Sequence, residues 1–325
     1  MFQLIPMDIK PKVNLNGKIK PYFYIINFSS DEESLCKMEM KCLFNKVPNV
    51  KHFFSYHYID PSRSPFIKEC ISIMYTGKSL EDIIHKITTD NLKYEKFKVS
   101  YINYGDETVG YENRRNIEYK LGQNIKGEAE MKNPELIFGV TKSNGKWIFG
   151  EYKKSEPDWK LHSRKPYSYS NALNSRVARA IVNIAVCNNS NYKVVDPCCG
   201  IGTVIIEALS LGINIKGWEI NPMIAANAKI NLKYLYYKNV ITTGTMHDIK
   251  DKFDVSIIDL PYGLFSPTTL KEQVDIMKTA RKISNKMVIV TFEDMDKHIL
   301  SAGFDIIDSC SVSKSKFKRY ITICK

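Results

Sequence analysis

Two short stretches of the chain decide its fold: Asp196-Pro197-Cys198-Cys199-Gly200-Ile201-Gly202-Thr203 and Asp259-Leu260-Pro261-Tyr262-Gly263. Each follows a short apolar run typical of a strand, and an acid, Glu219, ends a third such run between them. In open α/β sheets, ligands lie in the loops that follow the carboxyl ends of the strands. The two stretches therefore predict a parallel sheet with a ligand site at that edge.

The same alternation of strand and helix patterns continues on both sides of these loops. A helix is expected over residues 174–186, and two strand-like runs, 304–311 and 320–324, end the chain. Strands that alternate with helices are expected between them at 193–196, 214–218, 240–243, 255–258 and 286–292. This alternation predicts an α/β class, doubly wound, Rossmann-like sheet, to which the final pair of strands adds an antiparallel edge. We assign residues 156–325 to a linker followed by this domain.

Two smaller units are expected before it. Residues 1–90 alternate strand and helix patterns, which predicts a small α/β domain. Residues 91–155 combine strand patterns, a helix pattern that ends at Gly122 and a hairpin turn at Asn144-Gly145, which predicts an α+β unit. The polar and basic segment 151–166 fits either a solvated linker or a strip that contacts RNA.

Length and charge favour a protein with a polyanionic partner. The chain has 325 residues, enough for two or three domains, and a formal net charge of +12. Excess positive charge most often indicates a nucleic-acid partner. The alternative is a lysine-rich proteome with AT-rich codons, because Lys, Asn and Ile are all abundant.

The sequence predicts a cytoplasmic protein without a membrane span or a metal site. No run approaches the ~18 apolar residues of a membrane helix, and residues 1–12 lack the apolar core of a signal peptide. The eight cysteines form no C-x-x-C pair, and no paired histidines complete a zinc set. Free thiols in a reducing compartment are therefore expected.

The first loop has the features of a nucleoside-cofactor site. Gly200 and Gly202 let the backbone approach a ligand closely, and Thr203 opens a helix. Glu219 follows Asp196 by 23 residues, at a strand end where a carboxylate can accept hydrogen bonds from both ribose hydroxyls. Ile220 is then placed to flank an adenine.

Two further residues belong to the predicted cofactor site. Cys198 lies within the glycine loop, and Asp248 follows the third strand. An acid at the position of Asp248 commonly accepts a hydrogen bond from the adenine amino group, and the alternative is a surface acid in a polar loop. We predict S-adenosylmethionine as the cofactor.

Other cofactors fit the loop less well. A dinucleotide fingerprint, G-x-G-x-x-G, would need glycine or alanine at the position of Ile205. A phosphate-binding P-loop, G-x-x-x-x-G-K-[ST], does not occur in the sequence.

The second loop predicts methyl transfer to an exocyclic amino group. Such nitrogens are poor nucleophiles, and an enzyme activates them by placing acceptors for the amino hydrogens and aligning nitrogen with the methyl carbon. We assign the side chain of Asp259 as one acceptor and the backbone carbonyl of Leu260 as the other. Pro261 stiffens the turn, and Tyr262 can stack on the base. The usual form of this loop is [DN]-P-P-Y, so Leu260 is a departure from it.

A different chemistry is suggested by the Pro197-Cys198 pair, which is also found in cytosine-C5 methyltransferases. In those enzymes the nucleophilic cysteine lies in the loop after the fourth strand. Here that loop carries Pro261-Tyr262, and Cys198 lies in the cofactor loop instead. The arrangement therefore favours transfer to an amino group.

Taken together, the chain resembles the tRNA guanosine-N2 methyltransferases that carry a THUMP domain, an RNA-binding module. Residues 164–173 (Arg-Lys-Pro-Tyr-Ser-Tyr-Ser-Asn-Ala-Leu) carry this resemblance, together with Glu219-Ile220-Asn221-Pro222 and the two loops. The THUMP-like part is residues 91–155, including Glu130 to Pro134.

The resemblance implies a substrate, a cofactor and partners. The substrate is a guanosine in tRNA, methylated at N2 and often at position 10. Asp196, Gly200, Gly202 and Glu219 would bind S-adenosylmethionine, and Asp259 and Tyr262 would engage the guanine. Some members of the family need a small zinc-binding activator subunit, which is a further candidate partner beside tRNA.

Two other functions stay open at this level. The same type of catalytic loop serves adenine-N6 in DNA, bases in ribosomal RNA and glutamine amides in proteins. A non-catalytic RNA-binding protein with a degenerate methyltransferase fold is the third reading, and the departure at Leu260 is its only support.

Overall fold

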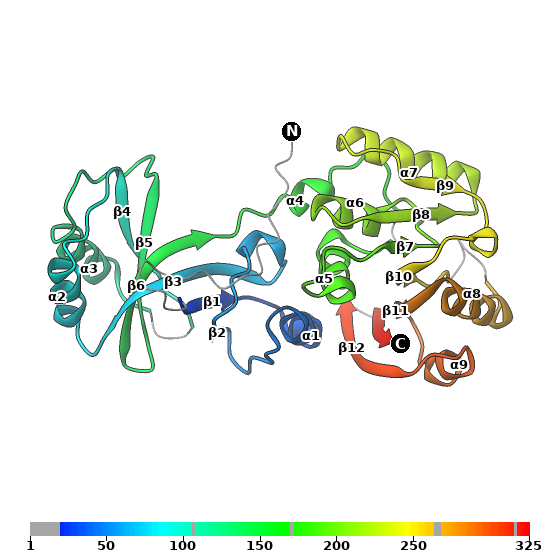
Figure 1. Cartoon of the computed structure of the whole chain (residues 1–325), viewed down its shortest axis with the longest axis horizontal. Coiled ribbons are helices and arrows are strands. Elements are labelled where there is room, and N and C mark those ends of the chain that lie inside the picture. The colour runs from blue at the N-terminus through cyan, green and yellow to red at the C-terminus, as the bar shows by residue number, and fades with distance from the viewer. Residues whose placement is uncertain (1–19, 106–107, 170–171, 263–267, 315–316) are drawn as a thin grey trace.

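A computed structural model describes residues 20–105, 108–169, 172–262, 268–314 and 317–325, which form two sheets flanked by helices (Figure 1). Parts of the predicted motifs, namely Gly263 and positions 170–171, lie outside these ranges.

The C-terminal sheet has seven strands in the order β12-β13-β11-β10-β7-β8-β9. β7 to β11 run parallel to one another, and β13 pairs antiparallel with both β11 and β12. This confirms the predicted doubly wound, Rossmann-like topology, with the antiparallel strand one position inside the sheet edge. The strands are β7 (Val194–Asp196), β8 (Ile215–Glu219), β9 (Ile241–Thr243), β10 (Phe253–Asp259), β11 (Ser284–Thr291), β12 (Ile306–Lys314) and β13 (Phe317–Cys324).

Helices cover both faces of this sheet because its central strands are apolar on both sides. Successive residues of β10 point to opposite faces, so Ile257 packs in the cluster that contains α5 and Ile258 packs in the one that contains α8. The helices of the domain are α4 (Trp159–His162), α5 (Ser175–Val186), α6 (Thr203–Ser210), α7 (Pro222–Tyr234), α8 (Leu270–Ile283) and α9 (Asp296–Ser301).

The N-terminal region forms a single six-stranded sheet in the order β2-β1-β3-β6-β5-β4. β3 pairs antiparallel with β6, so strands from the two units predicted on either side of residue 90 share one sheet. The elements are β1 (Tyr22–Ile26), α1 (Glu33–Phe44), β2 (His52–Ser55), β3 (Ile67–Gly77), α2 (Leu80–Thr89), β4 (Phe97–Tyr101), α3 (Tyr111–Gly122), β5 (Leu136–Ser143) and β6 (Lys146–Lys154), with short 3-10 turns at Ser30–Glu32 and Pro61–Arg63.

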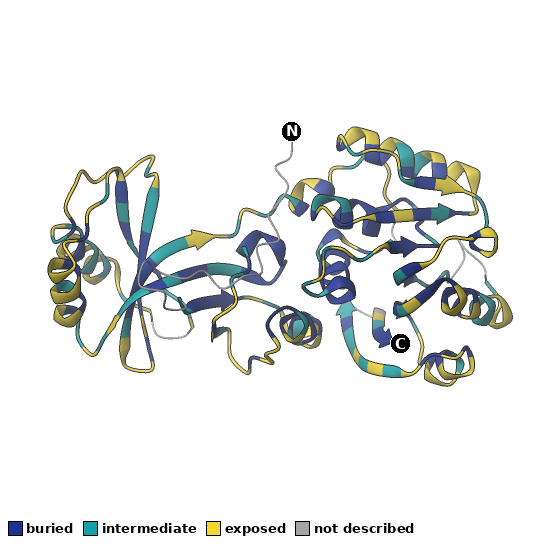
Figure 2. Ribbon diagram, in the orientation of Figure 1, coloured by how far each residue is buried: buried dark blue, intermediate teal, exposed yellow. Residues whose placement is uncertain are grey.

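The two ends of the N-terminal sheet have different surroundings. α2 and α3 lie at the end farthest from the C-terminal domain, and Figure 2 shows that most of their surface is exposed. α1 lies at the other end, against α5, and its residues Leu35 and Met40 join the same apolar cluster as Ile181 and Ala185 of α5. One hydrophobic core therefore crosses the boundary between the two sheets.

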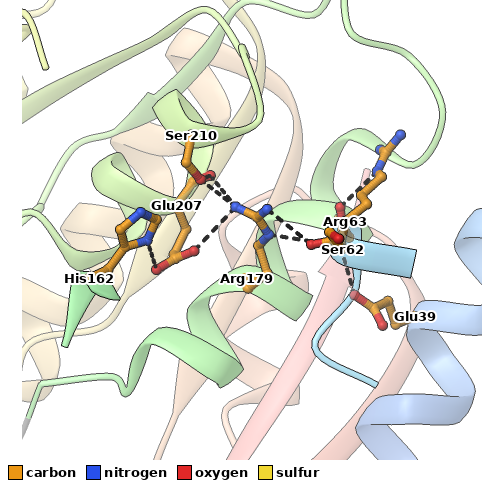
Figure 3. Close-up of polar contacts among 8 residues, drawn as sticks. Glu39, Ser62, Arg63, His162, Arg179, Glu207 and Ser210 are labelled. Carbon is orange, nitrogen blue, oxygen red and sulfur yellow. Dashed lines mark hydrogen bonds and ion pairs between the residues drawn. The ribbon is translucent and has the colours of Figure 1, made fainter. Parts of the chain in front are cut away.

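A buried polar network crosses the same boundary (Figure 3). The guanidinium of Arg179 donates to the carbonyl of Arg63 at 2.9 Å and contacts the carboxylate of Glu207 at 3.3 Å. Glu207 also contacts Nδ1 of His162 at 2.8 Å, and Arg179 donates to the hydroxyl of Ser210. Because buried charges are costly unless they are paired, this set holds α4, α5 and α6 to the segment around Arg63.

A second part of the network lies on α1. Asn183 of α5 donates its amide to Glu39 at 2.7 Å, and the hydroxyl of Ser64 donates to the other carboxylate oxygen at 2.5 Å. Glu39 is fully buried, and this burial raises its pKa from 4.5 to about 7.

The segment 151–166 is more ordered than the solvated linker considered from its composition. Its first residues continue β6, and Trp159 and His162 of α4 are buried against the C-terminal domain. The burial of these two side chains orders the segment. A count of charges over the segment does not reveal this burial.

Candidate active site

The structure brings three of the predicted acids to one edge of the C-terminal sheet. Asp196, Glu219 and Asp259 end β7, β8 and β10, which are adjacent strands in the order β10-β7-β8. The strands are parallel, so their carboxyl ends meet at the same edge, where ligands of such folds lie. The loops after β7 and β10 therefore face a common site.

The glycine loop between β7 and α6 is held in shape by Glu219. The Gly200 amide donates to one carboxylate oxygen of Glu219 at 3.0 Å, and the Asn221 amide donates to the other at 2.8 Å. Gly200 and Gly202 have φ of +52° and +82°, in the left-handed region that glycine adopts without strain. A Cβ at Gly200 would meet no other atom within 4 Å among the described residues, so space adjoins the loop there.

Asp196 is more deeply placed than a ligand-facing acid. Its side chain is 3% exposed, and one oxygen accepts the Cys198 amide at 3.3 Å. Burial, together with the charges of Asp259 and Glu219, raises its pKa well above the usual range, against the effect of that hydrogen bond. In this arrangement Asp196 holds the glycine loop from its buried side, through the hydrogen bond to the Cys198 amide. The hydroxyl of Thr203 is also buried, with no hydrogen-bond partner in the parts of the chain that the structure covers.

Two exposed apolar residues follow Glu219 closely in the sequence. Ile220 is 70% exposed and Met223 is 71% exposed, so both side chains are accessible to a ligand. Asp248, predicted to approach the adenine, ends a 3-10 turn after β9 and is exposed. The sequence did not single out Met223, which is the second residue of α7 and lies four positions after Glu219.

The thiol of Cys198 is poorly suited to nucleophilic attack. Its Sγ lies 3.8 Å from Sδ of Met246, and burial raises its pKa, as do the charges of Asp196, Glu219 and Asp259. The thiolate is the reactive form of cysteine, so these surroundings work against a C5-type mechanism.

Asp259 is half-buried, and one of its carboxylate oxygens, Oδ1, lies out of contact with solvent. Burial raises its pKa to about 7, while the charge of Arg319 lowers it. Its Oδ1 is buried and accepts no hydrogen bond from any of the residues that the structure describes. A buried carboxylate oxygen without a donor is costly, so Asp259 is prepared to receive an N–H group from a ligand.

Leu260 has a local reason to replace the usual proline. Its side chain is 3% exposed and packs in the cluster with Met246 and Ile289. Its amide donates to the carbonyl of Val290 at 3.0 Å, a bond that proline lacks the donor to make. The departure from [DN]-P-P-Y is thus accommodated by extending the β10–β11 ladder, and the loop keeps a backbone carbonyl at this position.

The rest of the loop is fixed from two other elements. The Pro261 carbonyl accepts from Oγ1 of Thr268 and Nε2 of Gln273, both at 3.1 Å. The Tyr262 ring lies on Phe292, with centroids 3.5 Å apart and planes inclined by 35°.

A pocket of about 370 Å³ opens beside this loop. It is lined by Leu260, Tyr262, Thr268, Leu270, Gln273, Thr291, Phe292, Glu293 and Met295. Sequence reasoning missed Gln273, Phe292 and Arg319 as neighbours of the catalytic loop. Only Phe292 left a signal, since it ends the strand predicted over 286–292.

Comparisons with known proteins find methyltransferases among the similar sequences. Residues 162–295 match the family described as RMKL-like, methyltransferase domain. The chain is 31% identical over 168 residues to a tRNA (guanine(10)-N2)-dimethyltransferase of Pyrococcus abyssi, covering 48% of this chain and 50% of that protein. The match to the enzyme of the same name from Methanocaldococcus jannaschii is 25% identical and covers 74% of this chain and 82% of that protein.

A relative named for a different RNA also matches. The U6 snRNA (guanine-N(2))-methyltransferase THUMPD2 of Mus musculus is 25% identical over 60% of this chain and 38% of that protein. Among solved structures, TrmN from Thermus thermophilus is similar with a TM-score of 0.47 and 14% identity, over 94% of this chain and 99% of that one. The match to the Pyrococcus abyssi protein spans half of that relative's length. No helix in the described ranges combines the length and apolar character needed to cross a bilayer.

Proposed function

We propose that this chain is an S-adenosylmethionine-dependent RNA methyltransferase that methylates the exocyclic N2 amino group of a guanosine in tRNA. The observation that carries the proposal is the buried Oδ1 of Asp259, without a donor among the described residues, at the end of β10 beside a pocket walled by Tyr262. An amino group is the kind of donor that such an oxygen requires.

The residues around the glycine loop fit the cofactor. Glu219 can accept from the ribose hydroxyls while it holds Gly200, the exposed side chain of Ile220 can cover one face of the adenine, and Asp248 lies after the next strand in the sheet. Asp196 and Cys198 shape the loop from its buried side, and Gly202 and Thr203 begin α6. S-adenosylmethionine supplies an electrophilic methyl group when it is bound.

The catalytic work of the chain is then positioning and charge stabilisation. Asp259 accepts one amino hydrogen of the base, and the Leu260 carbonyl accepts the other, so the nitrogen lone pair is directed at the methyl carbon. Positive charge develops on the nitrogen during transfer, and the carboxylate of Asp259 stabilises it before taking the proton. Tyr262 provides an aromatic face for the base, and Pro261 restricts the turn.

The substrate class rests on two independent observations. Four relatives are named as methyltransferases of guanine N2, three of them for tRNA and one for U6 snRNA. In addition, α3 exposes Tyr111 and Tyr119 near Arg115 and Lys120, on a chain with a net charge of +12. Exposed aromatic and basic side chains on one helix suit RNA contact.

The N-terminal region is assigned to RNA binding on this basis. We propose that residues 91–155 act as a THUMP-like module and contact the tRNA backbone, with the target guanosine turned out of its stack into the pocket. A small activator subunit is a further candidate partner, and a cytoplasmic location is consistent with tRNA as substrate.

Nucleoside mass spectrometry tests the proposal directly. Unmodified tRNA is incubated with the purified full-length chain and S-adenosylmethionine, then digested and analysed for N2-methylguanosine and N2,N2-dimethylguanosine. We expect one of these products from the wild type and at least a hundredfold less from Asp259→Ala, a loss typical of a removed general base. Calorimetry should give the two proteins the same cofactor affinity within about threefold, because Asp259 lies outside the glycine loop.

Parallel reactions separate the alternatives. Ribosomal RNA, U6-type small RNA, DNA and a glutamine-containing protein substrate are offered under the same conditions. Methylation of one of these with tRNA unmodified would overturn the tRNA assignment and keep the amino-methyltransferase chemistry. Absence of transfer to every substrate, with intact cofactor binding, would favour a non-catalytic RNA-binding protein.

A further inference from the structure

Arg319 enters the candidate site from the far end of the chain. It lies on β13, where Tyr320 pairs with Thr291, the last residue of β11. The antiparallel register therefore places Arg319 beside Phe292, immediately past the carboxyl end of β11. This is the same edge at which β10 ends in Asp259.

Its guanidinium contacts the catalytic loop and its aromatic support. Nη2 donates to the hydroxyl of Tyr262 at 3.3 Å, and Cζ lies 5.1 Å from the centroid of the Phe292 ring. Tyr262 itself lies on Phe292. One arginine thus joins both rings, and the planar guanidinium suits an aromatic face better than an ammonium group.

The same charge acts on the acceptor. Asp259 is faced by Asp196 and Cys198 from the glycine loop and by Tyr262 from its own loop, and none of these groups is a cation. Among the described residues, Arg319 is the cation whose charge favours the ionised form of Asp259.

We propose that Arg319 is a positioning residue for the methyl transfer, which fixes the Tyr262 ring against Phe292 and places a positive charge beside Asp259. The inference rests on the proposed function, since it assigns Arg319 a part in that reaction. Asp259 can take a proton only as a carboxylate, which is also the stronger acceptor for an amino hydrogen. Arg319 therefore extends the range of pH over which the site is competent.

The consequence for pH dependence has a defined sign. Burial brings the pKa of Asp259 to about 7, and removing a nearby positive charge raises it further. The acidic limb of the pH–rate profile, which reports ionisation of Asp259, should then move to higher pH. A variant that retains the charge should leave the limb in place, even if it loses contact with the rings.

Three variants of the full-length chain test this. Arg319→Met removes the charge, Arg319→Lys keeps it, and Arg281→Met is the matched control. Arg281 lies in the same domain, with Cζ 5.4 Å from the Phe304 ring and Nε donating to the Gly303 carbonyl at 2.8 Å. Single-turnover rates of tRNA methylation are measured from pH 6 to pH 9, with unfolding temperatures recorded for each variant.

We expect the acidic limb of Arg319→Met to move up by about one pH unit, which lowers the rate at pH 6.5 by about tenfold and restores it toward pH 9. Arg319→Lys should keep the wild-type limb with a rate reduced at every pH, because its ammonium loses the planar contact with Phe292 and Tyr262. Arg281→Met should match the wild type. An unmoved limb in Arg319→Met would overturn the proposal.

A second measurement separates this result from failure of the proposed function. Carbon-13 NMR of aspartate carboxyl groups follows the titration of Asp259 without RNA or cofactor, with assignment from an Asp259→Asn sample. If the wild type methylates no tRNA but the Asp259 titration still shifts upward in Arg319→Met, the proposed substrate is wrong and the action of Arg319 on Asp259 stands. Unchanged titration in Arg319→Met would refute that action whatever the substrate.

Discussion

Replacing Glu39 by Gln tests whether the boundary between the two sheets contains a carboxyl group that titrates near neutral pH. Glu39 is fully buried on α1, and burial raises its pKa to about 7, against the hydrogen bonds from Ser64 and Asn183 and the charge of Arg63. Gln has nearly the same shape and keeps an acceptor for Asn183, but it does not titrate. The substitution therefore isolates the effect of ionisation.

The sign and size of the effect follow from the two pKa values. The folded-state pKa lies above the unfolded value of 4.5, so the folded state binds more protons between pH 4.5 and pH 7. The free energy of unfolding of the wild type must fall as pH rises through this window and level off above it. Each pH unit between the two pKa values contributes about 1.4 kcal/mol, which gives a limit of about 3 kcal/mol. Between pH 5 and pH 8 the expected loss is about 2 kcal/mol.

Urea unfolding followed by circular dichroism measures this difference. We expect Glu39→Gln to gain about 2 kcal/mol relative to the wild type on going from pH 5 to pH 8. Other titrating groups cancel in the comparison because both proteins contain them. Glu33→Gln is the matched control, since it removes a partly exposed carboxylate of the same helix that pairs with Lys37 at 2.7 Å. A Glu39→Gln difference that is the same at both pH values would refute the reasoning and show that Glu39 is ionised in the fold.

Two other predictions concern the glycine loop and the domain boundary. Glu219→Gln should weaken S-adenosylmethionine binding about tenfold by calorimetry, because a charged acceptor for the Gly200 amide and the ribose is lost. An unchanged affinity would contradict the assignment of Glu219 to the cofactor site. A fragment of residues 156–325 should lose the cooperative thermal transition of the full chain, because it exposes the part of the core that α1 covers and leaves Arg179 without the Arg63 carbonyl. A fragment that unfolds at the same temperature as the full chain would show that contacts across the boundary contribute little to stability.

The C-terminal fold could be predicted closely because its signals are local. Apolar strand runs, glycine turns and acids at strand ends are read within a few residues of one another, and the structure places Asp196, Glu219 and Asp259 where that pattern puts them. The N-terminal sheet was harder to predict, because the antiparallel pairing of β3 with β6 joins residues about 80 apart, with two helices between them. A change of pattern near residue 90 marks a change of local structure, and it does not decide which strands share a sheet.

The candidate site divides in the same way. The residues of the two loops were predictable from the sequence. The structural reason for leucine at position 260 was not, because its amide donates to the Val290 carbonyl only when β10 and β11 are paired. Arg319 lies 60 residues beyond Asp259, on β13, which runs antiparallel to β11. Its position beside the catalytic loop depends on the pairing register of β13 with β11, which local sequence patterns do not predict. A basic residue in a lysine-rich C-terminal segment gives no sign that it faces an aromatic ring.

The buried network links the N-terminal sheet to the glycine loop of the C-terminal domain through α6. This helix begins at the glycine loop and contains Glu207, which contacts His162 and Arg179. Arg179 in turn is held by the carbonyl of Arg63, in the segment that leads into β3. A shift of the N-terminal sheet relative to the C-terminal domain would therefore break hydrogen bonds to a buried guanidinium, at a cost of several kcal/mol. The placement of the N-terminal sheet relative to the loop after Asp259 is consequently fixed by the fold. Under the proposed function, this fixed placement lets the distance from a bound RNA surface to the reacting base contribute to the choice of nucleotide.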